Sequence, residues 1–585
     1  MVLSDTTPIE GKAGSNRLVV LMHGWCGHFA MFSIKDVEDT VKEELPDADL
    51  MVPTFPSGIF SNTNLNEVCR KLAEAIDLAV EDQKRAGGEY QEIILIGFSL
   101  GTLIVRMTYL IGCGDMMAPY SSGVMRIYPW HQKVSRIILL AGNNRGWSMD
   151  PKPAKLLWRF YLMFRCFGPL RLFGLNKLIF SYKRGQPFVE NLRIQWLRRE
   201  QVSPIPPTIH LYGEEEDLVS REDMLDQQYC ANFILINVPG TGHSNAGNFH
   251  EPDFGPRRRD RFVRALTWPI NELKQDSQYI PPSDNPPEEL GNRDRPVTDV
   301  VFVIHGIRDW GGWTTEMSRS IDRIASEHDL SVNVIAPAYE RFPMFGFLMG
   351  WERRKKVEWF VNAYTRAFAA HPDARFHFIG HSNGTYLLAK SLELYEMMQV
   401  DRVAFAGSVV RRDYPWDKLI RQGRAQAVRN DRAADDIVVA VFPRFFELLK
   451  EATRIHLGDI GGAGVFGFQD DAGRDHEVLI RGGHGAAVES ENHASLARYV
   501  LGLDEKPKLD EAMAEKEAKR ISAKTEWLAR FCWLIWLGLA AIPVLLIYLL
   551  TIVLSGFPVV IGPSAAFAIS FVIVGIGIWW LLKTF

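Results

Sequence analysis

The sequence has few cysteines and no excess of basic residues. Its six cysteines lie far apart, with no CxxC pair and no clustered histidines, so neither a disulfide framework nor a metal site is indicated. We interpret them as reduced thiols. The formal net charge is −4, which lacks the basic bias of a nucleic-acid-binding protein. The residues therefore predict no metal, no cofactor and no nucleic-acid partner, and they leave the oligomeric state open.

The N-terminal tail, residues 1–16, also lacks the apolar core of a signal peptide, which favours a chain that begins in the cytosol.

The chain has 585 residues. Because single hydrophobic cores stop growing at roughly 250 to 300 residues, we expect at least two globular domains.

Charge is missing altogether from the segment Phe531 to Leu582. This length is sufficient for two membrane crossings of about 20 residues each, and we predict transmembrane helices at 531–554 and 563–582. Glycines and prolines between Ser555 and Pro563 mark the turn between them. The basic residues that flank the apolar segment place both of its ends, and the soluble domains, in the cytosol; they are Lys516, Lys519, Arg520, Lys524, Arg530 and Lys583.

The soluble part divides at 273–296, a segment rich in proline and acidic residues that indicates a linker. Before it, in 17–272, strand-like runs alternate with helical stretches: RLVVLM, DLMVP, EIILIG, RIILLAG, TIHLYG and FILINVPG. The same rhythm returns in 297–503 with VVFVIHG, VNVIAP, RFHFIG, RVAFAG, AQAVRND and HEVLIRGG. This pattern predicts an α/β fold of two tandem domains, each a mostly parallel sheet with helices on both faces. The charged segment 504–530 is predicted to be a helical spacer.

A nucleophile-elbow motif, Gly97-Phe98-Ser99-Leu100-Gly101, stands between an apolar strand and a helical stretch. Such a turn exposes its serine at the end of the sheet, and the flanking glycines allow strand and helix to approach closely. The earlier His23-Gly24-Trp25 ends another strand, so the backbone N–H groups of Trp25 and Leu100 are candidates for an oxyanion hole.

An acid and a histidine follow this serine in the chain. Asp217 and His243 each come after a strand, in the order Ser, acid, His. We predict that Ser99 attacks an acyl carbonyl, that His243 takes its proton and that Asp217 orients the imidazole. Competing acids in the same loop are Glu214, Glu215, Glu216 and Asp223.

The second domain repeats each part. His305-Gly306-Ile307 follows a strand, Gly380-His381-Ser382-Asn383-Gly384 follows another, and Asp436 and His484 come later. We predict Ser382, Asp436 and His484 as its catalytic residues, with Ile307 and Asn383 at its oxyanion hole. Asp431 and Asp435 compete with Asp436, and His493 competes with His484.

These motifs resemble the α/β-hydrolase superfamily, in particular its esterase, lipase and thioesterase members. The resemblance covers roughly Asn16 to Glu272 and Val297 to Leu503, and it implies acyl-transfer chemistry by a serine nucleophile. The expected function is a membrane-anchored serine hydrolase acting on a hydrophobic acyl or lipid substrate. Alternatives are a lipid- or partner-binding protein with inactive domains, and an acyltransferase.

Two apolar and basic segments suggest where such a substrate would approach. Residues 145–200 form an insertion at the position of a cap, with basic residues among large apolar ones, and residues Phe342 to Phe360 have a similar composition. A surface helix pair packed on the core is the alternative for the first segment. We predict that the first segment is a cap facing the membrane and that the second also contacts the bilayer.

Overall fold

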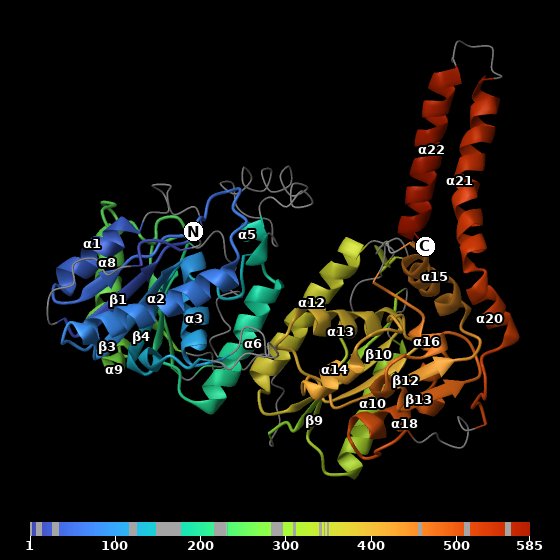
Figure 1. Ribbon diagram of the computed structural model, residues 1–585, viewed down its shortest axis with the longest axis horizontal. Helices are drawn as coiled ribbons and strands as arrows, with labels where there is room; N and C mark the ends of the chain where they lie inside the picture. The colour runs from blue at the N-terminus through green and yellow to red at the C-terminus, as the bar shows by residue number, and fades with distance from the viewer. Residues whose placement is uncertain are drawn as a thin grey trace. The chain divides into compact units, whose positions relative to one another are not determined.

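The computed structural model describes residues 3–6, 15–25, 34–115, 126–147, 177–215, 230, 232–281, 296–307, 312–337, 342–343, 346–347, 350–453, 459–507, 515–555 and 563–584. They form two compact units (Figure 1). The first comprises Met1–Gly291, Val361–Pro372 and Tyr395–Met397, and the second comprises Asn292–Phe360, Asp373–Leu394 and Met398–Phe585. Each unit contains one large sheet.

The first sheet has the strand order β2-β1-β3-β4-β5-β6-β7. Neighbouring strands are parallel except β7, which pairs antiparallel with β6. The strands are β1 (Arg17–Met22), β2 (Asp49–Met51), β3 (Glu92–Phe98), β4 (Val134–Leu140), β5 (Thr208–Gly213), β6 (Phe233–Val238) and β7 (Tyr279–Ile280).

Both faces of this sheet are buried, which explains why its strands read as continuous apolar runs. In β1, Leu18 and Val20 point into one core cluster and Val19 and Leu21 into the other. Helices α2 (Leu65–Arg85) and α3 (Leu100–Gly112) cover the first face, and α1 (Lys35–Glu44) and α8 (Gly255–Thr267) cover the second. The remaining helices of this part are η2 (Pro129–Lys133), α5 (Lys177–Ser181), α6 (Pro187–Val202) and α9 (Ile270–Leu273).

The second sheet repeats the architecture with the order β9-β8-β10-β11-β12-β13, all parallel. Its strands are β8 (Asp299–Ile304), β9 (Val332–Ile335), β10 (Arg375–His381), β11 (Arg402–Ala406), β12 (Ala427–Ala433) and β13 (His476–Ile480). The order matches β2-β1-β3-β4-β5-β6 of the first sheet strand for strand. Every strand-like segment named from the sequence forms a strand, and the predicted α/β class with mostly parallel sheets is confirmed.

Helices connect and follow the strands of the second sheet. They are α10 (Gly312–Glu327), α12 (Gly350–Ala370), α13 (Asn383–Leu394), α14 (Trp416–Arg421), α15 (Ile437–Thr453), α16 (Ala463–Phe466), α17 (Asp471–Arg474) and α18 (His493–Val500), with the short η6 (Ala486–Val488) and η7 (Ser490–Asn492). After them come α20 (Ala523–Arg530), α21 (Cys532–Ser555) and α22 (Pro563–Thr584).

Helix α21 is long and apolar enough to cross a membrane, with a mean hydropathy of 2.7 over its most apolar stretch, none of which is buried. Helix α22 contains a shorter apolar stretch, Pro563–Ile578, and packs along α21 (Figure 1).

Two predicted connections differ from the structure. Strand β7 lies inside the predicted linker 273–296, and in the predicted helical spacer 504–530 only α20 is a helix longer than one turn among the described residues. Glu517 instead forms an antiparallel bridge with Ile480 of β13. In both cases the chain covers the edge strand of a sheet, whose unpaired N–H and C=O groups offer hydrogen bonds that a linker or isolated helix would leave unused.

The predicted membrane-facing patches are mostly buried where the structure describes them. Most of α6, which ends the proposed cap, is buried, and residues 148–176, with Arg159, Arg165 and Arg171, lie outside the described residues. In the second patch, Phe342 and Phe347 are buried, and the buried Arg353 pairs with Asp459 at 2.7 Å. These three side chains pack in the protein interior. The prediction that they contact the bilayer is therefore wrong for Phe342, Phe347 and Arg353.

A buried ion pair lies in β12, the strand next to the edge strand β13 of the second sheet. Arg429 and Asp431 of β12 are fully buried and bonded through both carboxylate oxygens, each at 2.7 Å. Asn492 donates a further hydrogen bond to Asp431 at 2.8 Å.

Replacing Asp431 by alanine leaves the Arg429 guanidinium buried without its carboxylate. We expect Asp431→Ala to lower the free energy of unfolding of the second unit by about 3 to 5 kcal/mol. Hydrogen exchange of peptides from β12 would measure this loss. The matched control is Asp471→Ala, because the Asp471 side chain is 95% exposed and its surface ion pair contributes little. Equal protection in both variants would contradict the expectation.

Candidate active sites

Two serines sit in the same unusual backbone conformation. Ser99 lies between the last residue of β3 and the first of α3 with φ 52° and ψ −119°, and Ser382 lies between β10 and α13 with φ 51°. A non-glycine residue held at positive φ costs of order 1 to 3 kcal/mol and persists only where the surroundings enforce it. Both strand-to-helix turns therefore hold a serine under strain, as a nucleophile elbow requires.

Each serine lies at the point where the strand order of its sheet reverses. β1 lies between β2 and β3, so the loops that follow β1 and β3 leave the sheet toward opposite sides and a crevice remains between them. A Cβ on Gly24, in the loop after β1, would lie 2.8 Å from the Ser99 Cβ. In the second unit a Cβ on Gly306 would lie 2.8 Å from the Ser382 Cβ. Only glycine lets the loop approach the serine this closely.

In the first site, the Ser99 Oγ lies 2.7 Å from the His243 Nε2. Both residues are buried, and the Phe98 ring packs 6.2 Å from the imidazole, centroid to centroid. Asp217 lies outside the described residues, together with its competitors Glu216 and Asp223. Glu214 and Glu215 are described, and both are exposed although His243 is buried.

In the second site, the Asp436 Oδ2 lies 2.8 Å from the His484 Nδ1. Asp436 is fully buried, and its Oδ1 accepts a hydrogen bond from the Val439 N–H at 2.9 Å. A carboxylate on Nδ1 fixes the imidazole tautomer and leaves Nε2 as the proton acceptor.

The competing residues of the second domain have other partners. Asp431 pairs with Arg429, and the Asp435 carboxylate accepts the Gly482 N–H at 3.2 Å. The His493 Nε2 lies 2.9 Å from the Val488 carbonyl oxygen. The structure thus brings Asp436 and His484 together and places the three alternatives elsewhere.

The serine and histidine of the second site are not hydrogen-bonded to each other in the part of the chain that the structure describes. Instead, His381, which precedes Ser382, donates from Nε2 to the His484 carbonyl oxygen at 3.1 Å, and the two rings lie 4.8 Å apart. His381 occupies the position of Phe98 in the first site. His381 is part of the elbow motif in the sequence, but only the fold shows that it contacts the loop that carries His484.

The predicted oxyanion-hole donors lie at consistent places in both sites. Leu100 and Asn383 are the first residues of α3 and α13, and the first N–H groups of an α-helix have no partner within the helix. Trp25 and Ile307 directly follow the glycines that touch the serines. The preceding His23 and His305 place Nδ1 2.7 and 2.8 Å from the carbonyl oxygens of Gly24 and Gly306, which gives both imidazoles a structural role.

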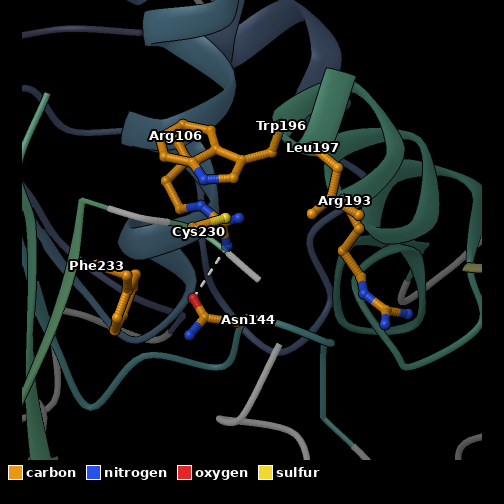
Figure 2. Close-up of a pocket in the computed structure, with 7 residues that line it drawn as sticks. All are labelled: Arg106, Asn144, Arg193, Trp196, Leu197, Cys230 and Phe233. Atoms are coloured by element: carbon orange, nitrogen blue, oxygen red, sulfur yellow. Dashed lines mark hydrogen bonds between the residues drawn. The ribbon is translucent and has the colours of Figure 1, made fainter. Parts of the chain in front are cut away.

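Behind the first elbow, side chains that line a small pocket fix the position of α3 (Figure 2). Arg106 of α3 donates to the Asn144 Oδ1 at 3.0 Å, and its guanidinium lies 4.5 Å from the Trp196 ring centroid. These contacts join the elbow helix to the loop after β4 and to α6. The pocket lining includes neither Ser99 nor His243.

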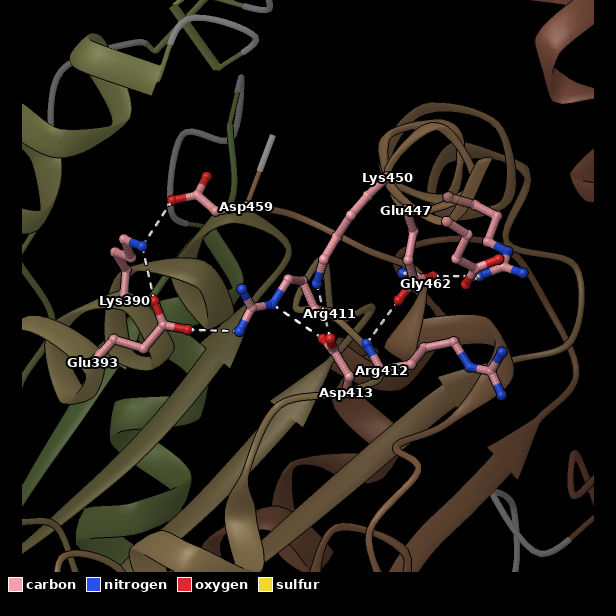
Figure 3. Close-up of polar contacts among 11 residues, drawn as sticks. Lys390, Glu393, Arg411, Arg412, Asp413, Glu447, Lys450, Asp459 and Gly462 are labelled. Atoms are coloured by element: carbon pink, nitrogen blue, oxygen red, sulfur yellow. Dashed lines mark hydrogen bonds and ion pairs between the residues drawn. The ribbon is translucent and has the colours of Figure 1, made fainter. Parts of the chain in front are cut away.

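Behind the second elbow, α13 is connected to α15 by a chain of charged contacts (Figure 3). Glu393 of α13 pairs with Arg411 at 2.9 Å, Arg411 pairs with Asp413 at 3.2 Å, and Asp413 pairs with Lys450 of α15 at 2.9 Å. The helix after Ser382 and the helix after Asp436 are thereby held in one network.

Asp459, at the edge of this network, is strongly acidic. Burial raises its pKa, but Arg353 and Lys390 outweigh that effect and lower the pKa to about 2. The Asp459 carboxylate is therefore ionised at neutral pH and forms ion pairs with Arg353 and Lys390. The described residues contain no group of three or more His, Cys, Asp or Glu side chains that could hold a metal ion.

No protein-family model matches the sequence, and no curated protein matches it. Solved structures that resemble the chain include the propionate-bound esterase Est2 of Thermogutta terrifontis, with 14% identity, a TM-score of 0.29, and coverage of 47% of this chain and 88% of that chain. The esterase Pf2001 of Pyrococcus furiosus has 13% identity and a TM-score of 0.28, and the match covers 44% of this chain and 84% of that one.

A third similar structure is the phospholipase PlaB of Legionella pneumophila in complex with thio-NAD. It shows 15% identity and a TM-score of 0.30, with coverage of 44% of this chain and 61% of that chain. Because these identities and scores are low, the geometry of the two sites carries the functional argument.

Gly24 provides a direct test of the first site. We expect Gly24→Ala to push the Ser99 side chain out of position and to slow its reaction with a fluorophosphonate by about 100-fold, the effect of a displacement near 1 Å. Mass spectrometry of the Ser99 peptide measures the rate. In the control Gly58→Ala the new methyl group meets no atom within 4 Å, so labelling stays unchanged. Normal labelling of Gly24→Ala would show that the loop does not set the serine position.

Proposed function

We propose that this chain is a membrane-anchored serine hydrolase that cleaves carboxylic ester or thioester bonds of a hydrophobic acyl or lipid substrate. The observation that carries the proposal is the 2.7 Å contact between the Ser99 Oγ and the His243 Nε2, made by a serine at positive φ between a strand and a helix. A serine hydroxyl is a weak nucleophile unless a base accepts its proton, and this contact supplies the base.

The proposed reaction proceeds by acyl transfer to the serine. The Ser99 Oγ attacks the acyl carbonyl carbon while the His243 Nε2 takes the hydroxyl proton, and the N–H groups of Leu100 and Trp25 stabilise the oxyanion. As the ester bond breaks, His243 returns the proton to the leaving alcohol or thiol. Water then attacks the acyl-serine, with His243 again as the base. The bond between the Ser99 Oγ and the acyl carbon breaks, His243 returns the proton to the Oγ, and the carboxylic acid leaves. Asp217 is the proposed acid of this site.

We propose the same chemistry for Ser382, His484 and Asp436, with the N–H groups of Asn383 and Ile307 as the oxyanion donors. The 2.8 Å contact between Asp436 and His484 supports it, because a buried carboxylate on Nδ1 stabilises the imidazolium that forms during the reaction. The Ser382 hydroxyl must still turn toward the His484 Nε2. Catalytic hydrogen bonds that are open in a free enzyme often tighten when substrate binds.

The membrane part of the proposal rests on α21. Its length and composition support a span, and we propose that α22 returns the chain so that both soluble domains face the cytosol. An enzyme held at a bilayer meets acyl chains at high local concentration, which favours phospholipids, acylglycerols or S-acylated proteins as substrates.

Serine replacement tests the chemistry. We expect Ser99→Ala and Ser382→Ala each to abolish fluorophosphonate labelling of its own site, and the double variant to lose acyl-ester hydrolysis by at least about 10³-fold. The control is Ser391→Ala, because Ser391 is also buried but bonds only to the Leu387 carbonyl in α13.

The outcomes separate the alternatives. A folded protein that never labels and hydrolyses no acyl ester would be a lipid- or partner-binding protein instead. Transfer of the acyl group to an added alcohol in preference to water would make it an acyltransferase.

Extraction tests the anchor. We expect the full chain to remain in the membrane pellet after alkaline carbonate washing. Replacing Leu545 and Leu546 together by arginine should release it, since each arginine at a helix centre costs about 2.5 to 3.5 kcal/mol of insertion. Trp527→Arg is the control, because Trp527 lies before the span. Release of the unaltered chain by carbonate would contradict the anchor.

A further inference from the structure

The segment that follows the second domain pairs with the strand leading to His484. The Ala518 N–H donates to the Leu479 carbonyl at 2.7 Å, and the Arg481 N–H donates to the Lys516 carbonyl at 2.6 Å. Glu517 and Ile480 are the antiparallel pair between these two bonds. Arg481 lies three residues before His484, so the pairing fixes the start of the histidine loop.

The same segment also contacts the loop that carries the acid. The Ser522 N–H donates to the Ala434 carbonyl at 3.1 Å, two residues before Asp436. The Ser522 Oγ accepts the Thr525 N–H at 3.3 Å and so caps α20. Beyond His484, Lys516 pairs with Glu489 at 2.7 Å and with Glu491 at 2.6 Å. One short segment thus touches the chain before the acid, before the histidine and after the histidine.

The start of the apolar helix α21 extends these contacts to α15. Trp536 stacks on Phe445 with 4.8 Å between ring centroids, and it meets Phe442 and Phe446 edge to face at 5.8 and 5.5 Å. Its Nε1 donates to the Val441 carbonyl at 3.3 Å. Because α15 begins directly after Asp436, the root of the apolar helix rests on the helix that holds the acid (Figure 1).

A matched feature in the first unit shows what is particular to the second. There β7 covers the edge strand β6 in the same antiparallel sense, and the chain then runs on toward the second domain. In the second unit the covering segment runs directly into α20 and α21. Edge protection is common to both units, whereas among the described residues the link from the site to an apolar helix is found in the second.

We propose that four residues of this segment and of the start of α21 act as positioning residues that hold Asp436 and His484 in register. They are Lys516, Ala518, Ser522 and Trp536. This inference rests on the proposed serine chemistry at Ser382. It assigns the segment a catalytic support function in addition to tethering, and it makes the second site dependent on the root of α21. Ser99 and His243 belong to the first unit and this segment belongs to the second, so the first site provides a control within the same molecule.

Proline replacement in the full chain tests the pairing with β13. Ala518→Pro removes the N–H that bonds Leu479, whereas Glu517→Pro removes an N–H that points away from β13, as it does in every such pair. We expect Ala518→Pro to slow fluorophosphonate labelling of Ser382 at least ten-fold and Glu517→Pro to leave it unchanged. Ser99 labelling should be normal in both.

Tryptophan replacement tests the contact with α15. In a Ser99→Ala background, Trp536→Ala should lower kcat for p-nitrophenyl octanoate at the second site several-fold without changing KM, and Trp536→Phe should restore it. Trp533→Ala is the control, since Trp533 is 46% exposed and lies three residues earlier in α21. A purely structural role would lower the amount of active enzyme in proportion to folded protein and would give no change in kcat per labelled site.

Either of two results would overturn the inference: normal Ser382 labelling in Ala518→Pro, or an equal loss at Ser99 and Ser382. If Ser382 never labels in the unaltered chain, the proposed chemistry of the second site fails instead. Hydrogen exchange over 476–490 then decides the inference alone. Faster exchange in Ala518→Pro than in Glu517→Pro supports the bracing of the histidine loop, and equal exchange refutes it.

Discussion

The close approach of a loop backbone to a strained serine is the constraint on which both halves of the molecule depend. A Cβ on Gly24 or Gly306 would press on the neighbouring serine, and a Cβ on Gly101 or Gly384 would lie 2.2 or 2.5 Å from the carbonyl oxygen of Met22 or Ile304. The elbow therefore forms only where two adjacent parallel strands bring glycines together. The alternation of strands and helices serves this meeting point, since it sets β1 beside β3 and β8 beside β10.

The sequence was sufficient to predict nearly all of the sheet framework. Strands buried on both faces read as unbroken apolar runs, and the loops between them carry the HG and elbow motifs, so strand identity and serine position follow from local pattern. β12 is predicted as well, although its centre reads VRND, because AQAVRND falls in the repeated alternation of strand-like and helical stretches. Its buried Arg429 and Asp431 satisfy each other, which is how so polar a sequence occupies the interior.

What the sequence did not predict depends on contacts between distant residues. β7 and the Glu517 bridge are too short to show a strand pattern, and they form because β6 and β13 leave an edge open. The burial of Arg353 depends on Asp459, more than a hundred positions away. For the same reason, the amphiphilic composition of 342–360 predicts a membrane contact, whereas in the fold Arg353 of this segment pairs with a distant residue of the same chain. Among the competing acids of the second domain, only tertiary contacts separate Asp436 from Asp431 and Asp435.

The two sites are built alike but supported differently, and this difference has a physical consequence. At the first site a phenylalanine packs near the histidine ring, and the sheet edge is closed by β7 within the same unit. At the second site a histidine holds the histidine loop by a hydrogen bond, and the edge is closed by the chain leading into the apolar helix. The loops that carry Asp436 and His484 are thus hydrogen-bonded to the segment that enters α21, and the proposed positioning of these two side chains rests on those bonds. The two units thus share one strand order and a serine at positive φ, and among the described residues the second unit bonds its candidate acid and histidine loops to the chain that enters α21.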